Sequence, residues 1–141
     1  MTAEEVAQKS AEAMWSTDAA SKWLGMEKVE VAEGKAVFRL EVMPHHCNGH
    51  GILHGGVTFA LADTAFAFAC NSRNRITVAQ SNAITYLAPG RLGDVVTATA
   101  IEQRLAGRTG IYDVTVTRGD GEVIAEFRGQ SRALSGTLYE D

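Results

Sequence analysis

The fold of this chain is decided by residues 51–72, which read GILHGGVTFALADTAFAFACNS. Helix-forming residues dominate from Phe59 to Cys70, no proline interrupts them, and apolar side chains would occupy every face of a helix. A helix that is apolar on all sides is usually enclosed by other structure. The sequence therefore predicts one central buried helix from about Gly55 to Asn74.

Asp63 is the only formally charged side chain between Gly51 and Ser72. An ionised carboxylate in apolar surroundings is costly unless it is paired, so we interpret Asp63 as a reactive group or as half of a buried ion pair. The apolar segments on either side of it are only a few residues long, whereas a membrane span needs about 20 apolar positions. The stretch is therefore predicted to be the buried helix of a soluble protein.

Length and composition predict a single domain over residues 1–141, because a chain of 141 residues that is 45% hydrophobic can enclose one helix with a sheet. The net charge of −4 argues against a general binder of nucleic acid or of anionic membranes. The N-terminus carries acidic residues early and lacks an apolar core, so we expect no secretory signal and a cytoplasmic location. Cys47 and Cys70 fit no CxxC spacing and are predicted to be inert thiols.

The segments on either side of the central helix show first a helical and then an alternating hydrophobic pattern. Residues 3–14 predict an amphipathic helix, and Thr17-Asp18 can cap a short turn that leads to Leu24. Alternating runs at 29–31 and 36–42 predict a hairpin, and four further strands are expected at 76–87, 95–104, 109–117 and 123–134. We therefore predict an α+β fold in which an antiparallel β-sheet wraps around one long central α-helix.

The glycines that precede Asp63 suggest a reaction at a carbonyl group. Gly55 and Gly56 at a helix start leave N–H groups unpaired, where a developing oxyanion is favoured. Asp63 lies eight residues further on, about 12 Å along the helix axis, which is too far for one helix to present both groups to one carbonyl carbon. An antiparallel helix from a second subunit would bring them together, so the spacing predicts a homodimer with two shared sites.

Several motifs on this order of elements resemble those of the hotdog-fold acyl-CoA thioesterases: Asn48, His54-Gly55-Gly56, Leu61-Ala62-Asp63 and Ser81. The run LADTAFAFACNS, the turn at 86–90 and the ending at 127–131 are similar to the PaaI-type thioesterases of phenylacetate degradation. The resemblance covers nearly the whole chain. It implies a cytoplasmic hotdog thioesterase that needs no cofactor, takes coenzyme A only as part of its substrate, and assembles as a dimer of dimers, a homotetramer.

The resemblance also implies catalytic roles. Asp63 would attack the thioester or act as general base on a water, and the sequence leaves both routes open. The Gly55 N–H would polarise the thioester carbonyl, and Asn48 would hydrogen-bond the water or the substrate oxygen. His54 would orient the loop or the thioester, and Ser81 would hold the carboxylate or the water. Asn48 and Ser81 could instead serve only as local hydrogen-bonding residues, as such side chains often do.

Further residues are candidates for substrate binding: Gly56, Phe66, Tyr86, Pro89 and Arg91. An aromatic slot of Phe59, Phe66, Phe68 and Tyr86 could accept a phenylacetyl group, although core packing is an equal alternative. Five arginines could attract the phosphates of coenzyme A, although solvated surface positions are the simpler interpretation: Arg73, Arg75, Arg91, Arg104 and Arg108.

Other functions remain open. His46, His50 and His54 recur every four residues, but the glycines between them argue against the helix that would align them on a metal. The expected activity is hydrolysis of phenylacetyl-CoA or its ring-hydroxylated derivatives. The alternatives are a thioesterase of broad aromatic or medium-chain range and a non-catalytic acyl-CoA-binding module.

Overall fold

The computed structural model describes residues 1–141 as three α-helices, one short 3₁₀ helix and six strands. The helices are α1 (Ala3–Trp15), α2 (Ala19–Leu24) and α3 (Gly55–Cys70), with the 3₁₀ turn at Pro44–His46. The strands are β1 (Glu27–Ala32), β2 (Lys35–Glu41), β3 (Thr77–Tyr86), β4 (Val95–Ala106), β5 (Thr109–Thr117) and β6 (Val123–Ala133). Every predicted element is present, and most boundaries agree within two residues.

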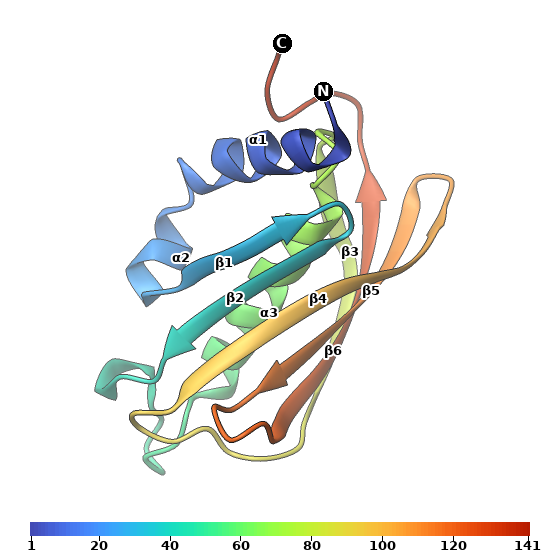
Figure 1. Cartoon of the computed structure of the whole chain (residues 1–141). Helices are drawn as coiled ribbons and strands as arrows, with labels where there is room; N and C mark the ends of the chain where they lie inside the picture. Colours follow the sequence, from blue (N-terminus) through green and yellow to red (C-terminus); the bar gives the residue numbers. More distant parts are fainter.

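One antiparallel sheet with the strand order β1-β2-β4-β5-β6-β3 forms the body of the protein. The sheet curls around α3, which lies in its concavity, while α1 and α2 lie beyond the β1 side of the sheet (Figure 1). The chain enters the sheet by one hairpin, crosses through α3 and adds β3 at the far edge, next to β6. The predicted α+β hotdog fold is confirmed.

The central helix is shorter than predicted, because it ends at Cys70 and not at Asn74. The Asn71 side chain explains the stop: its Nδ2 donates to the carbonyl oxygens of Ala67 and Thr77, and its Oδ1 accepts from the Thr77 N–H. These bonds tie the helix end to the start of β3. Asn74 itself has a φ of 58°, which a continuing helix does not allow.

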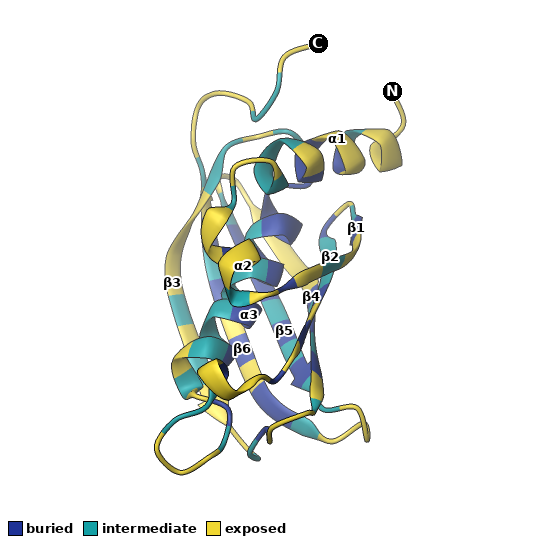
Figure 2. Ribbon diagram, turned by 90° about the vertical axis from the view of Figure 1, so that its left-hand side faces the viewer, coloured by how far each residue is buried: buried dark blue, intermediate teal, exposed yellow.

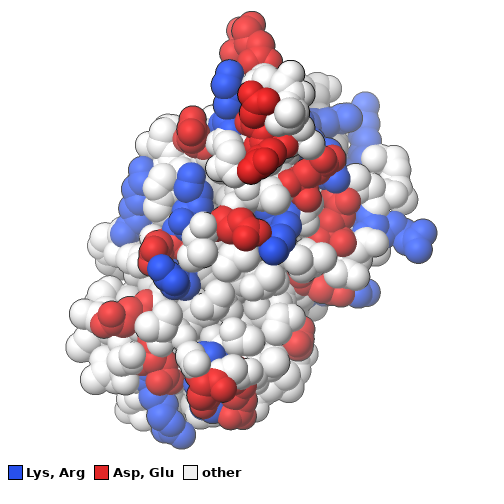
Figure 3. All heavy atoms as spheres, viewed as in Figure 1, with Lys and Arg blue, Asp and Glu red and all other residues white.

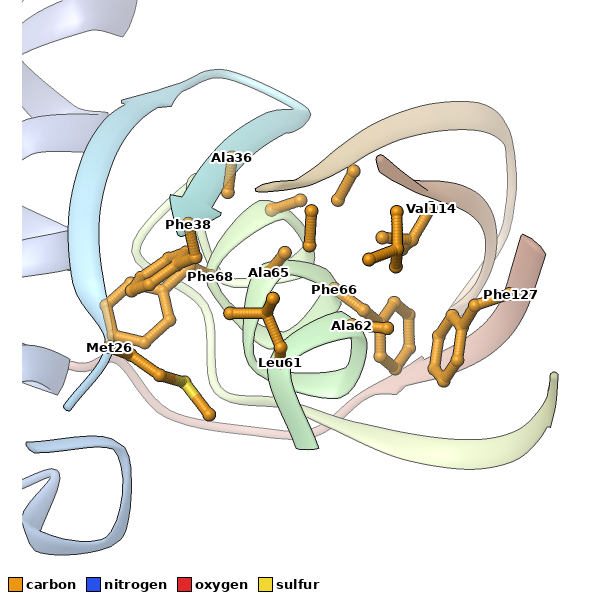
Figure 4. Packing of buried hydrophobic residues seen from close by; sticks show 14 of the residues in the cluster. Met26, Ala36, Phe38, Leu61, Ala62, Ala65, Phe66, Phe68, Val114 and Phe127 are labelled. Atoms are coloured by element: carbon orange, nitrogen blue, oxygen red, sulfur yellow. The ribbon is translucent and has the colours of Figure 1, made fainter. Parts of the chain in front are cut away.

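The core contains two aromatic groups on either side of α3. Phe68 contacts Phe38 with ring centroids 4.8 Å apart, and Phe66 contacts Phe127 at 5.9 Å. Figure 4 shows these two pairs on opposite sides of the helix, with small alanines between them. This arrangement explains why apolar residues surround the helix in the sequence.

β3 is an edge strand, and most of its side chains are exposed (Figure 2). A β-bulge interrupts its pairing with β6: Ala79 pairs with Ser131 and Ser81 with Gln130, which leaves Gln80 as an extra residue. Because side chains alternate along a strand, one extra residue reverses which side chains face α3. This phase change decides which polar residue of β3 reaches the helix.

The N-terminal helices pack against the same framework. α1 begins with a capping box between Thr2 and Glu5, and α2 is capped by Asp18. The carboxyl-terminal tail returns to this region, where Lys9 lies over the Tyr139 ring. No helix combines the length and the hydropathy that a membrane crossing requires.

Candidate active site

The loop before α3 is held in place by backbone bonds at both ends. The His54 N–H donates to the His46 carbonyl, and the Leu53 N–H donates to the Gly90 carbonyl. His54 is the N-cap of α3, and its Nδ1 accepts from the Gly56 N–H at 2.8 Å. His54 therefore caps and orients the start of the helix.

Gly55 carries the first N–H group of the helix. It donates to no acceptor in the chain, whereas the Gly56 N–H is taken by His54. The Tyr86 hydroxyl donates to the Gly55 carbonyl at 2.8 Å and fixes the residue. A Cβ at Gly55 would lie 3.2 Å from the Tyr86 ring, so glycine allows this close approach. The result is a free donor at the positive end of a helix, suited to an oxyanion.

Asn48 forms hydrogen bonds within its loop and also lines a cavity. Its Oδ1 accepts from the N–H groups of His50 and Ile52, at 2.9 and 3.4 Å, and so shapes the loop. Its Nδ2 donates to no group of the chain, and the residue lines a cavity together with Gly55. The local hydrogen-bonding role is therefore present, and both N–H groups of Nδ2 remain for a ligand.

This first cavity has a volume of about 420 Å³ and lies beside the start of α3. Tyr86, Pro89, Ile52 and Ile124 are among the residues that form its walls. Arg91 does not line it. The Arg91 N–H donates to Asp94, and its side chain is exposed.

Asp63 lies in a second cavity, of about 310 Å³, which shares no lining residue with the first. Its walls come from α3 and from the N-terminal segment, and include Met14, Leu24 and Ala60. Burial raises the pKa of the Asp63 carboxyl, and a hydrogen bond from Asn82 opposes that rise. No cation contacts the carboxylate within the chain, so the buried ion pair that the sequence left open does not form there.

Asn82 is the hydrogen-bond partner of Asp63 that sequence reasoning missed. Its Nδ2 donates to Asp63 Oδ1 at 2.9 Å, while its own Oδ1 is buried without any partner. An orphaned buried acceptor costs about 1–3 kcal/mol. The protein therefore keeps a stabilising contact to the carboxylate despite a local loss of stability.

Ser81, which the resemblance assigned to this role, faces the other way. It pairs with Gln130, whereas Asn82 pairs with Gly129, where a Cβ would lie 2.7 Å from the Phe66 ring of α3. Asn82 is thus on the helix side and Ser81 on the outer side of the sheet. The bulge at Gln80 shifts the alternation by one residue, and a single sequence carries no clear signal of it.

Phe66 is not brought to either cavity. Its side chain is 1% exposed and packs edge-on against Tyr112, with a centroid distance of 5.6 Å. Phe68 is equally enclosed, next to Phe38 and Trp15. Of the predicted aromatic slot, Tyr86 lines the first cavity and Phe68 lines the second.

Two of the three histidines that suggested a metal, His46 and His54, are engaged by other hydrogen bonds. His46 is buried, accepts from the Met43 N–H and lies 2.6 Å from the Leu24 carbonyl through its Nε2. No group of three or more potential ligands is gathered in the chain. Burial raises the pKa of the Cys70 thiol to about 12, which keeps it protonated and unreactive.

Surface charge gives no strong field of one sign. Lysines and arginines alternate with acidic residues over the face seen in Figure 3. Several arginines are paired with carboxylates, as in Arg39 with Glu27 and Arg128 with Asp113. Arg75, Arg91, Arg104 and Arg108 belong to no ion pair.

Comparison with known proteins identifies the family. The model of the thioesterase superfamily matches residues 50–125. Acyl-coenzyme A thioesterase PaaI of Escherichia coli K12 is 42% identical over 132 residues, which cover 94% of each chain. The structure of the E. coli PaaI protein from the phenylacetic acid degradation operon matches with a TM-score of 0.94 and 40% identity, over 96% of this chain and 99% of that one.

A protein from Streptococcus mutans UA159, solved with bound acetyl-CoA, matches with a TM-score of 0.76 and 26% identity, over 80% of this chain and 90% of that one. The matched family region includes the glycines at the start of α3 and the carboxylate in its middle. The chain therefore belongs to the thioesterase superfamily.

Proposed function

We propose that this protein is an acyl-CoA thioesterase that hydrolyses phenylacetyl-CoA or ring-hydroxylated phenylacetyl-CoA. The observation that carries the proposal is that α3 carries two groups suited to this reaction. The Gly55 N–H has no acceptor in the chain, and the Asp63 carboxylate contacts no cation. The first can stabilise an oxyanion and the second can attack or remove a proton. The names of the E. coli relatives support the substrate class.

The reaction uses water or the carboxylate itself as the attacking group. On the first route, Asp63 takes a proton from water as the water oxygen bonds to the thioester carbon. The carbon–sulfur bond then breaks, and the departing coenzyme A sulfur takes up a proton. On the second route, an Asp63 oxygen bonds to the thioester carbon, the carbon–sulfur bond breaks and coenzyme A leaves with a proton on its sulfur. Water then hydrolyses the resulting anhydride, which releases the acid and restores the Asp63 carboxylate. The Gly55 N–H stabilises the oxyanion on both routes.

Each complete site is shared between two subunits. Gly55 and Asp63 are about 12 Å apart along α3, and they open into two cavities without a common lining residue. A symmetric partner would place its own Gly55 cavity against the Asp63 cavity of this chain. The free outer edge of β3 also supports association, because an exposed strand edge favours pairing. We extend this to a cytoplasmic homotetramer, a dimer of two such dimers.

Coenzyme A enters as part of the substrate, and no further cofactor is required by this chemistry. Pro89 and Tyr86 line the Gly55 cavity and belong to the proposed substrate contacts. Arg91 remains a candidate for the phosphates, because its guanidinium pairs with no carboxylate.

The activity is tested by release of free thiol from acetyl-, hexanoyl-, benzoyl-, phenylacetyl- and hydroxyphenylacetyl-CoA at fixed pH. We expect kcat/KM to favour the phenylacetyl esters over acetyl-CoA by roughly 100-fold, since a buried ring contributes a few kcal/mol. A maximum at hexanoyl-CoA would assign the broad-range thioesterase instead. Binding of acyl-CoA without thiol release would assign a non-catalytic module and contradict the proposal.

The same panel is measured on Asp63→Asn, which is nearly isosteric but can neither attack as an anion nor act as a base. We expect a loss of roughly 100-fold or more in kcat with the oligomer intact. Hydrolysis at the wild-type rate would exclude Asp63 from the reaction.

The shared site is tested by mixing two inactive proteins, Gly55→Pro and Asp63→Asn. A hybrid dimer then holds one site with both changes and one site with neither, so activity returns. Gly55→Ala is the matched control, because it meets Tyr86 in the same way but keeps the N–H. If verified hybrids remain inactive while Gly55→Ala is active, the two groups do not work across an interface.

A further inference from the structure

We propose that Asn82 is a positioning residue of the active site: its amide N–H holds Oδ1 of Asp63 and leaves Oδ2 as the oxygen that reacts. This inference rests on the proposed function, because it assigns a role within the same site. The contact joins β3 to the middle of α3, and Asn82 Nδ2 and Asp63 Oδ1 are 2.9 Å apart. It is the only side-chain hydrogen bond that Asp63 receives in the chain.

The unpaired half of the Asn82 amide argues against a purely structural role. Asn82 Oδ1 is buried and accepts no hydrogen bond. A residue kept only to fill space between β3 and α3 would be apolar, as Ile84 is two positions further along the same face. The donor toward Asp63 is therefore the feature that accounts for an asparagine at this position.

The bulge in β3 serves the same contact. If β3 continued from Ala79 in regular pairing, without the bulge, Ser81 would lie opposite Gly129 and face α3, and Asn82 would face outward. Bulges often redirect a side chain next to an active site. Here the redirected side chain is the one that reaches the carboxylate of α3.

The surroundings of Asp63 offer no substitute for Asn82. Asp18, at the N-terminus of α2, lines the same cavity, and its carboxylate is engaged by Ser21. Cys70 lies two turns further along α3, and Thr64 donates to the Ala60 carbonyl. None of these groups carries a positive charge. Asn82 is thus the one neighbour that favours the ionised form of Asp63, whose pKa burial raises.

Asn82→Leu and Asn82→Asp test the role, with Thr85→Ala as the matched control on the outer face of the same strand. The carboxyl resonance of Asp63, assigned by its absence in Asp63→Asn, is followed against pH by carbon-detected NMR. We expect its titration to move upward by about one pH unit in Asn82→Leu, and further in Asn82→Asp, where two carboxyls compete for one proton. Thr85→Ala should titrate as the wild type does.

Kinetics supply the second readout. The acidic limb of kcat/KM against pH should move upward in the same order, and kcat should fall about tenfold in Asn82→Leu while KM changes little. An Asp63 titration that stays in place in the nearly isosteric Asn82→Asp would overturn the inference. If the titration moves but the wild type hydrolyses no thioester, the Asn82 contact stands and the proposed function fails.

Discussion

The two sides of α3 differ in how completely they are enclosed. On the core side, Phe66 is 1% exposed and locked between Tyr112 and Phe127. On the other side, Asp63 is half-buried in a cavity of about 310 Å³ and has one hydrogen-bond partner. One helix therefore contributes a closed packing surface and an open surface that carries the proposed reactive carboxylate, only a few residues apart in sequence.

The difference indicates that close packing on the core side of α3 holds the carboxylate on the other side in a fixed geometry. A reactive carboxylate must keep its geometry without the ion pairs that would neutralise it. The core side provides this geometry, because close-packed rings hold the helix axis against the sheet. Substitutions on the two sides should therefore affect different properties, stability on one and turnover on the other.

The largest effect is expected from Phe66→Ala, which should lower the free energy of unfolding by about 3–5 kcal/mol. The substitution removes a fully buried ring and leaves a cavity between α3 and β6. Urea denaturation with equal m-values is the measurement. Phe59→Ala is the matched control, since Phe59 contacts the same Phe127 ring but is only partly buried, so it should cost less.

If Phe66 lines the acyl pocket, as the sequence suggests, the kinetics would show it. Phenylacetyl-CoA would then lose more kcat/KM than hexanoyl-CoA at a temperature where Phe66→Ala is folded. An equal loss for both substrates supports a packing role alone, as its contacts indicate.

An intermediate effect is expected from Gly129→Ala on β6. The added Cβ would lie 2.7 Å from the Phe66 ring, so the ring or the strand must move. Overpacking of this kind costs about 1–3 kcal/mol. Phe66→Leu in the same chain should recover part of that loss, which a double-mutant cycle measures directly. Strict additivity of the two changes would show that the close approach is not the cause.

The sequence allows the fold and half of the site to be predicted, for physical reasons. The hairpin, the helix and the meander follow from hydrophobic periodicity and turn residues, and Gly55 and Asp63 stand out by their chemistry. The face of α3 that carries Phe66 could not be chosen, because a helix that is apolar all round has no amphipathic signal. Asn82 was missed because a bulge leaves periodicity unchanged on either side and only shifts its phase.

The end of the helix illustrates the same limit. Residues 71–74 are compatible with a helix by composition, but the Asn71 side chain bonds to Ala67 and Thr77 and ends it. Side-chain bonds to backbone compete with helix formation, and their outcome depends on which strand lies nearby. The end of this helix therefore depends on tertiary contacts, which the pattern of residues does not reveal.

The smallest effect concerns the stability that the protein loses by burying Asp63. Burial raises the pKa of its carboxyl in the folded protein, so the folded state holds the proton to higher pH than the unfolded chain does. The stability associated with the protonated form is complete below the unfolded pKa of about 3.9 and is lost as the pH rises through the folded pKa. Asp63→Asn does not titrate, so it should become more stable relative to the wild type between acidic and neutral pH.

Asp113→Asn provides a control of opposite sign. Arg128 donates two hydrogen bonds to the Asp113 carboxylate and lowers its pKa, so this carboxylate stabilises the fold above its unfolded pKa. Stability in the wild type is lost as the pH falls through the folded pKa of Asp113, and the variant should therefore be less stable than the wild type at neutral pH. Denaturation midpoints of the three proteins, measured from about pH 2 to pH 7 at one ionic strength, give both differences. A wild type more stable than Asp63→Asn at neutral pH would mean that a cation from a partner subunit stabilises Asp63, and the reactive surface of α3 would then contribute to stability as the packed surface does.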